Sequence, residues 1–245
     1  MPDDVLRLAV LIDADNASAA VIGDILAEIS KLGTASVKRI YGDFTTSNLQ
    51  GWKAILAEHA IQPVQQFRNT TGKNATDSAL IIDAMDLLHT RQLQGFCLVS
   101  SDSDFTRLAT RIREDGFPVY GFGEEKTPSS FIKACDRFIY TEIFRQKPAA
   151  ASKKETSTKS QPLRNLNRDE RFRSAFQQSV DAAMTDGSRA HLGAVGSHLL
   201  KLLPDFDSRN YGFQKLSELV EAIPGYRIVR EKTAGGYPVA YVERK

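Results

Sequence analysis

The chain has 245 residues, of which 42% are hydrophobic and 25% are charged, and its formal net charge is +2. This composition is ordinary for a soluble globular protein and excludes a disordered, collagen-like or disulfide-rich chain. No apolar stretch has membrane-spanning length, and Met1 is followed by acidic residues, unlike a signal peptide. Because the sequence contains only two cysteines, Cys97 and Cys135, we expect no disulfide framework and a cytoplasmic location.

The charge is divided unevenly along the chain. Residues 1–145 carry 15 Lys and Arg against 19 Asp and Glu, a net charge of −4, whereas residues 146–245 carry 17 against 11, a net charge of +6. The basic half could meet a polyanion. A charge of this size is also found in domains that bind no polyanion.

Strands and helices are predicted to alternate through the first half. Strands are predicted at residues 6–12, 36–44, 61–67, 95–101 and 118–123, with a last extended piece at 137–143. Helices are predicted at residues 17–32, 48–59, 76–89, 104–115 and 129–134. Pro63 favours an edge position for its strand, and Thr76 is a predicted helix N-cap. The alternation predicts an α/β domain, with a parallel sheet and helices on both faces.

Aspartates follow two of these strands and open one helix. Asp13 ends the first apolar run, Asp102 and Asp104 follow the fourth, and Asp77 lies at the head of the helix at 76–89. In open parallel sheets, ligands bind beyond the carboxyl ends of the strands. Two carboxylates about 5 Å apart repel by roughly 3 kcal/mol at an effective dielectric constant of ~20. Such a cluster needs a cation or raised pKa values, and Mg²⁺ or Mn²⁺ suits oxygen ligands.

Other roles stay open for some of these residues. Capping of turns or helices is the alternative for the aspartates. Asp15 is either a further carboxylate of the cluster or a turn residue. Asp43 and Asp86 are expected to be solvated charges.

A second domain is predicted after a linker. Residues 146–161 contain no large apolar residue, and we place a flexible linker at 146–165. Helices are then predicted at 168–184, 192–203 and 211–223, and a hairpin is predicted from strands at 226–231 and 237–244. Three helices and a hairpin are the pattern of a small winged-helix (α+β) domain, placed at 166–245.

Three motifs of the first domain occur in the order found in a known family, and a fourth stretch also matches that family. They are LIDADN (11–16), GKNATD with its downstream IIDAMD (72–86), LVSSDSDF (98–105) and VYGFGEEKTPSSF (119–131). Residues 8–144 thereby resemble the NYN domain, a relative of the PIN nucleases, of the type found in limkain and LabA-like proteins. The resemblance implies a PIN-like fold and a metal-dependent ribonuclease.

The same resemblance implies roles for individual residues. Asp13, Asp77, Asp102 and Asp104 would be the catalytic metal ligands, for Mg²⁺ or Mn²⁺. Asn16 would be a polar group beside the metal or the substrate. We also expect Ser101 and Lys73 to contact the substrate, with ordinary turn or loop roles as the alternative for Ser100, Ser101 and Lys73.

The segment HLGAVGSHLLKLLPDFDSRNYGFQKLSELVEAIPGY (191–226) resembles the LOTUS domain, also called OST-HTH. This resemblance implies that the second domain recognises RNA or a protein partner. The leading interpretation is therefore a metal-dependent ribonuclease that hydrolyses RNA phosphodiester bonds and carries an RNA-binding or partner-binding domain.

Two other functions are considered. One is a catalytically silent RNA-binding adaptor. The other follows from Asp13-Ala14-Asp15, which resembles the nucleophile motif of haloacid-dehalogenase phosphatases. That family also needs a suitably placed lysine and a cap, and the sequence offers neither. The sequence leaves open the oligomeric state, the cleavage mode and whether DNA is also a substrate.

Overall fold

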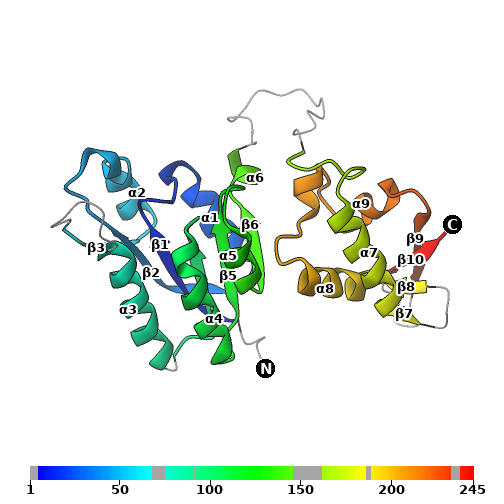
Figure 1. Ribbon diagram of the computed structural model, residues 1–245, viewed down its shortest axis with the longest axis horizontal. Helices are drawn as coiled ribbons and strands as arrows, with labels where there is room; N and C mark the ends of the chain where they lie inside the picture. Colours follow the sequence, from blue (N-terminus) through cyan, green and yellow to red (C-terminus); the bar gives the residue numbers. More distant parts are fainter. Residues whose placement is uncertain (1–4, 68–74, 91, 146–161, 186–188, 233–237) are drawn as a thin grey trace. The chain divides into compact units, whose positions relative to one another are not determined.

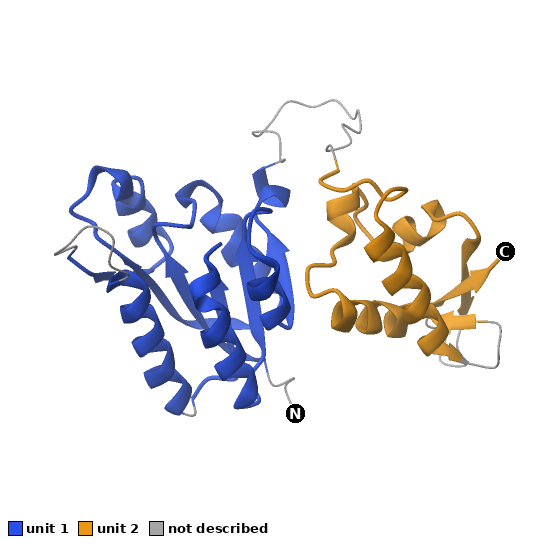
Figure 2. Cartoon of the chain, viewed as in Figure 1, with its two compact units in different colours: residues 1–145 blue, residues 146–245 orange. Residues whose placement is uncertain are grey.

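The computed structural model describes residues 5–67, 75–90, 92–145, 162–185, 189–232 and 238–245. The chain forms two compact units, residues 1–145 and 146–245, which are described separately (Figure 2). Across the described ranges, no helix has the length and apolar character needed to cross a membrane.

A six-stranded sheet forms the centre of the first unit (Figure 1). Its strands are, in spatial order, β3 (Gln62–Gln65), β2 (Thr34–Gly42), β1 (Arg7–Asp13), β4 (Gly95–Val99), β5 (Val119–Gly123) and β6 (Arg137–Tyr140). All neighbouring strands are parallel. The central strands β1 and β4 are buried almost throughout, because both of their faces are apolar. The predicted fold class is confirmed, and the strand that contains Pro63 lies at an edge.

Helices cover both faces of the sheet (Figure 1). On one face lie α1 (Ile22–Ile29), α2 (Trp52–Glu58) and α6 (Glu142–Arg145), which share a core with alternate residues of β1. On the other face lie α3 (Ala75–His89), α4 (Thr106–Glu114) and α5 (Ser129–Ala134). Short 3₁₀ segments, η1 (Ala19–Val21), η2 (Ser47–Leu49) and η3 (Ser103–Phe105), precede α1, α2 and α4. The unit is thus a three-layer α/β/α sandwich.

Two local predictions in this unit are wrong. Thr76 is not the N-cap of α3, because Ala75 is already helical and Thr76 is buried inside the first turn. The last extended piece, predicted to reach residue 143, ends at Tyr140 and is followed by α6 from Glu142. In α6, the side chain of Phe144 packs into the core on the α1 face. The helical turn directs this side chain toward that core.

The second unit combines three helices with a small antiparallel sheet. The helices are α7 (Glu170–Ala183), α8 (Leu192–Leu202) and α9 (Leu216–Ala222). The strand order is β7 (Met184–Thr185), β8 (Arg189–His191), β10 (Pro238–Arg244) and β9 (Tyr226–Lys232). The predicted hairpin is present as the antiparallel pair β9 and β10. The strands β7 and β8 were not predicted, because two or three residues are too few to show a periodicity.

The helix predicted at 211–223 is shorter than expected. Its first residue belongs to a 3₁₀ turn, η4 (Ser208–Tyr211), and α9 starts only at Leu216. Gly212 between them has a φ of 84°, a left-handed conformation that interrupts a helix.

The start of the second unit also differs from the prediction. Most of the predicted linker, 146–165, lies outside the described residues, but its end is anchored. The backbone N–H of Arg164 donates to the carbonyl oxygen of Asn210 at 2.9 Å. The Arg164 guanidinium donates to the buried carboxylate of Asp205 at 2.8 Å. Residues 164 and 165 therefore belong to the folded unit.

Candidate metal centre

The topology of the first sheet brings the ends of β1 and β4 together. The strands β2 and β3 follow β1 in the sequence and lie on one side of it in the sheet. The next strand, β4, lies on the other side of β1. Ile12 pairs with Val99 in the parallel register, so Asp13 and Ser100 are the next residues of the two strands. This is a topological switch point, the place where open parallel sheets bind ligands.

Asp13 is fully buried at this point and is held by three donors. Its Oδ2 accepts hydrogen bonds from the Ser100 hydroxyl and the Asn16 amide, each at 2.8 Å. Its Oδ1 accepts one from the backbone N–H of Asp15 at 3.1 Å. Burial raises the pKa of Asp13, although these hydrogen bonds favour the ionised form. The carboxylate therefore has a fixed orientation set by its neighbours.

Three further carboxylates converge near Asp13. Asp77, Asp102 and Asp104 each offer an oxygen, and these oxygens all lie within 4.8 Å of one another. Asp77 projects from the first turn of α3. Asp102 is the N-cap of η3, and its Oδ1 accepts from the backbone N–H of Asp104 at 2.9 Å. Asp77 and Asp102 are half-buried, and Asp104 is exposed.

The charges of this cluster act on one another. Burial, followed by the charges of Asp13, Asp102, Asp104 and Asp15, raises the pKa of Asp77 to about 6. Asp13 has the largest effect among these charges, so its carboxylate is electrostatically part of the site. The structure thus groups Asp77, Asp102 and Asp104, with the buried Asp13 near enough to act on Asp77 by its charge, and Asp15 contributes a weaker, exposed charge.

The donor set suits a hard divalent cation. In the described part of the chain, the grouped ligand atoms are all carboxylate oxygens, the type that Mg²⁺ and Mn²⁺ prefer. Capping accounts for part of the placement of Asp102. At Asp77, burial of the carboxyl group and then the like charges around it raise the pKa. A cation would offset this repulsion.

The residues expected to contact substrate differ in their exposure to solvent. Asn16 is exposed and donates to Asp13. Ser101 is buried, and its hydroxyl oxygen accepts from the backbone N–H of Glu124 at 2.8 Å. Ser100 is the serine that contacts Asp13, and its hydroxyl oxygen also accepts from the backbone N–H of Asp102 at 3.0 Å. Lys73 lies outside the described residues.

Three other aspartates of the first unit lie outside the acidic cluster. Asp83 on α3 accepts hydrogen bonds from Arg39 and from the Tyr41 hydroxyl, so it joins α3 to β2. Asp86 is exposed, as expected. The expectation of a solvated Asp43 is wrong, because its buried carboxylate accepts from the Gln65 amide at 2.8 Å and from Thr45.

A hollow of about 770 Å³ lies between α2 and the edge strand β3. It is lined by Phe44, Leu49, Gln50, Lys53, Leu56, Pro63 and Gln65. Leu49, Phe44 and Leu56 belong to the core on the α1 and α2 face of the sheet. The hollow is therefore on the α2 side of the sheet, whereas Asp77 projects from α3 on the other side. No local pattern in the sequence predicts the hollow, because its lining comes from three separate segments.

Comparison with known proteins identifies a family for each unit. The model of the NYN domain matches residues 7–142, and the model of the OST-HTH/LOTUS domain matches residues 159–238. Both matches agree with the resemblances carried by the sequence motifs. No curated protein matches the chain significantly.

Two solved structures show partial similarity. A protein of unknown function from Vibrio parahaemolyticus RIMD 2210633 is 17% identical with a TM-score of 0.48, over 56% of this chain and 94% of that chain. An uncharacterised protein from Nitrosomonas europaea is 27% identical with a TM-score of 0.31, over 40% of this chain and 92% of that chain.

Proposed function

Because this chain belongs to the NYN domain family, we propose that it is a metal-dependent ribonuclease whose LOTUS unit binds RNA. The NYN domain is part of a nuclease superfamily, and LOTUS domains bind RNA. The observation that carries the proposal is the convergence of Asp77, Asp102 and Asp104 within 4.8 Å, close to the buried Asp13.

In this proposal the four aspartates hold Mg²⁺ or Mn²⁺. When bound, such an ion neutralises charge on the phosphate and makes water a better nucleophile. Ser100 and Asn16 hold Asp13 in one orientation through their hydrogen bonds. Asp77, with its pKa near 6, is mostly ionised at neutral pH and available as a ligand.

The RNA strand would cross the carboxyl edge of the sheet, past the acidic site on the α3 side and the hollow on the α2 side. The half-buried ring of Phe44 and the apolar walls suit a nucleobase, and the exposed Lys53 suits a phosphate. Asn16, Ser101 and Lys73 stay proposed substrate contacts. The hollow would thus receive a nucleotide further along the strand than the one at the cleaved bond.

The test compares Asp102→Asn with Asp86→Asn, an equal change of charge at an exposed aspartate of α3. Purified proteins are incubated with single-stranded and structured RNAs in EDTA, Mg²⁺ or Mn²⁺. We expect metal-dependent cleavage by the parent and by Asp86→Asn, and a loss of at least about 100-fold in Asp102→Asn. Equal cleavage by Asp102→Asn would contradict the assigned site. Absence of cleavage by the parent under all conditions would favour the silent RNA-binding adaptor.

A further inference from the structure

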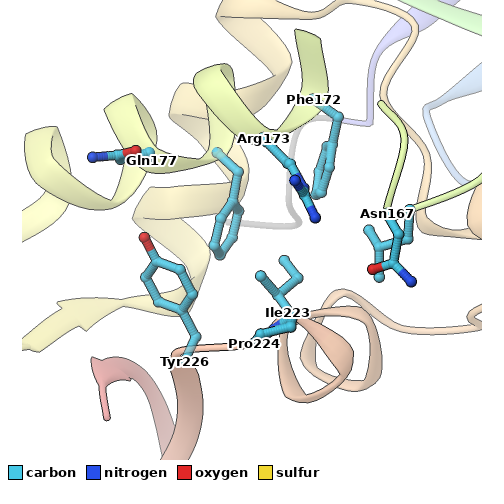
Figure 3. Close-up of a pocket in the computed structure, with 9 residues that line it drawn as sticks. Asn167, Phe172, Arg173, Gln177, Ile223, Pro224 and Tyr226 are labelled. Atoms are coloured by element: carbon cyan, nitrogen blue, oxygen red, sulfur yellow. The ribbon is translucent and has the colours of Figure 1, made fainter. Parts of the chain in front are cut away.

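A pocket opens on the second unit between α7 and the segment that joins α9 to β9 (Figure 3). Its volume is about 190 Å³. It is lined by Leu166, Asn167, Phe172, Arg173, Phe176, Gln177, Ile223, Pro224 and Tyr226. The pocket lies within one unit, so its shape depends on the fold of that unit alone.

The floor of the pocket is aromatic and rigid. Phe172 and Phe176 are buried, and their rings stack with centroids 5.7 Å apart and an interplanar angle of 27°. Tyr226 meets Phe176 edge-on at 5.1 Å and is only half-buried. Figure 3 shows the rings of Tyr226 and Phe172 turned toward the same space, with Ile223 and Pro224 below it. A flat aromatic ligand could therefore contact Tyr226 and the apolar floor together.

The rim of the pocket is polar and carries a positive charge. Arg173 and Gln177 come from one face of α7, Asn167 comes from the turn before that helix, and all three are exposed. In Figure 3 the guanidinium of Arg173 reaches toward Ile223 across the mouth of the pocket. Of the described residues that line the pocket, none carries a carboxylate. This charge pattern favours an anionic ligand.

We propose that this pocket binds one unpaired nucleobase of a single-stranded RNA. Tyr226 contacts the base face, Arg173 pairs with a backbone phosphate, and the amides of Asn167 and Gln177 supply donors and acceptors for the base edge. A base within a duplex stays stacked and cannot enter a pocket of this kind. The proposal rests on the RNA-binding part of the proposed function and gives it a location.

The test measures RNA binding by the full chain in EDTA, in an Asp102→Asn background, so that cleavage plays no part. The variants are Tyr226→Leu, which keeps an apolar side chain without a ring, and Arg173→Gln. The matched controls are Tyr241→Leu on β10 and Arg230→Gln on β9, outside the pocket lining. The probes are a short single-stranded RNA that contains 4-thiouridine and the same sequence as a duplex.

We expect Tyr226→Leu to weaken single-strand binding about tenfold, the effect of losing one stacked base, with a smaller loss in Arg173→Gln. Both controls should bind like the parent. Crosslinks to the thiouridine should map to residues 166–177 or 223–226. Parental affinity in both pocket variants, or crosslinks confined to other segments, would overturn the proposal. An equal loss of duplex binding would also overturn it, because a flipped base would then not be required.

Tyr226→Leu could weaken folding, so its thermal unfolding is measured alongside. Arg173→Gln and the crosslink map do not depend on that variant. A protein that binds through the pocket but cleaves nothing would contradict the nuclease and leave this inference standing. A protein that cleaves RNA while the pocket variants bind normally would contradict this inference and leave the nuclease proposal standing.

Discussion

The two units present surfaces of opposite character. The first carries a net charge of −4 and presents converging carboxylates, whereas the second carries +6 and presents an aromatic pocket with an arginine at its rim. A phosphate is repelled by the first site unless a cation is bound there, but the second needs none. The proposed function therefore assigns RNA affinity to the second unit and cleavage to the first.

In the proposed function, the linker predicted from the composition of residues 146–161 would join the two activities. Such a tether would make the second contact with a bound RNA intramolecular and would raise the local concentration of RNA near the acidic site. The second unit would then hold the substrate, and the first would act on it only when metal is present.

The largest effect is expected from Phe172→Ala, which tests whether the two units are energetically separate. Phe172 is buried and its ring stacks on Phe206 at 5.6 Å. Its truncation should cost the second unit about 3–5 kcal/mol of unfolding free energy. Calorimetry should show the transition of the second unit moving to lower temperature while that of the first stays in place, with cleavage of a short RNA retained. A shift of both transitions would show that the units unfold together.

The next test uses the pH dependence of the acidic site. Without metal, the folded state raises the pKa of Asp77 from 3.8 to about 6, so it binds the proton more tightly than the unfolded state does. This contribution to stability is fully present below about pH 4 and is lost as the pH rises through 6. The raised pKa of Asp13 acts in the same direction.

In EDTA, the unfolding temperature of the first unit should therefore fall between pH 5 and pH 7.5, and it should fall less in Asp77→Asn. Mg²⁺ should stabilise the parent more at pH 7.5 than at pH 5, because it binds ionised carboxylates. Asp86→Asn serves as the control for charge alone. If the unfolding temperatures of the parent and of Asp77→Asn depended on pH in the same way, protonation of Asp77 would not be the cause.

The smallest effect is expected from Lys53→Ala, in the hollow on the α2 side of the sheet. The loss of one exposed phosphate contact should raise KM about threefold and leave kcat unchanged. Lys31→Ala is the control, since Lys31 is an exposed lysine paired with Glu28 at 2.7 Å. Steady-state kinetics on a short RNA would measure both. An unchanged KM for Lys53→Ala would remove the hollow from the proposed RNA path.

The sequence predicted most of the first unit because its signals are local. Apolar runs such as LAVLI and GFCLV specify strands buried on both faces, and an aspartate directly after such a run must lie at the carboxyl end of the sheet. Pro63 marked an edge strand for an equally local reason, since it cannot donate a hydrogen bond. The fold class and the position of Asp13 and Asp102 at the carboxyl edge of the sheet could therefore be predicted without coordinates, whereas the resemblance to the NYN domain assigned Asp77 and Asp104 to the same site.

Other features depend on how distant segments meet, and the tertiary structure alone decided them. Ser100 and Ser101 are adjacent, and the strand register that pairs Ile12 with Val99 selects Ser100 as the partner of Asp13. Asp43 is buried because Gln65 arrives from β3 to donate to it. The two hollows are lined by segments that are remote in sequence. Side-chain periodicity specifies the face of an element, but only packing determines which neighbour that face meets.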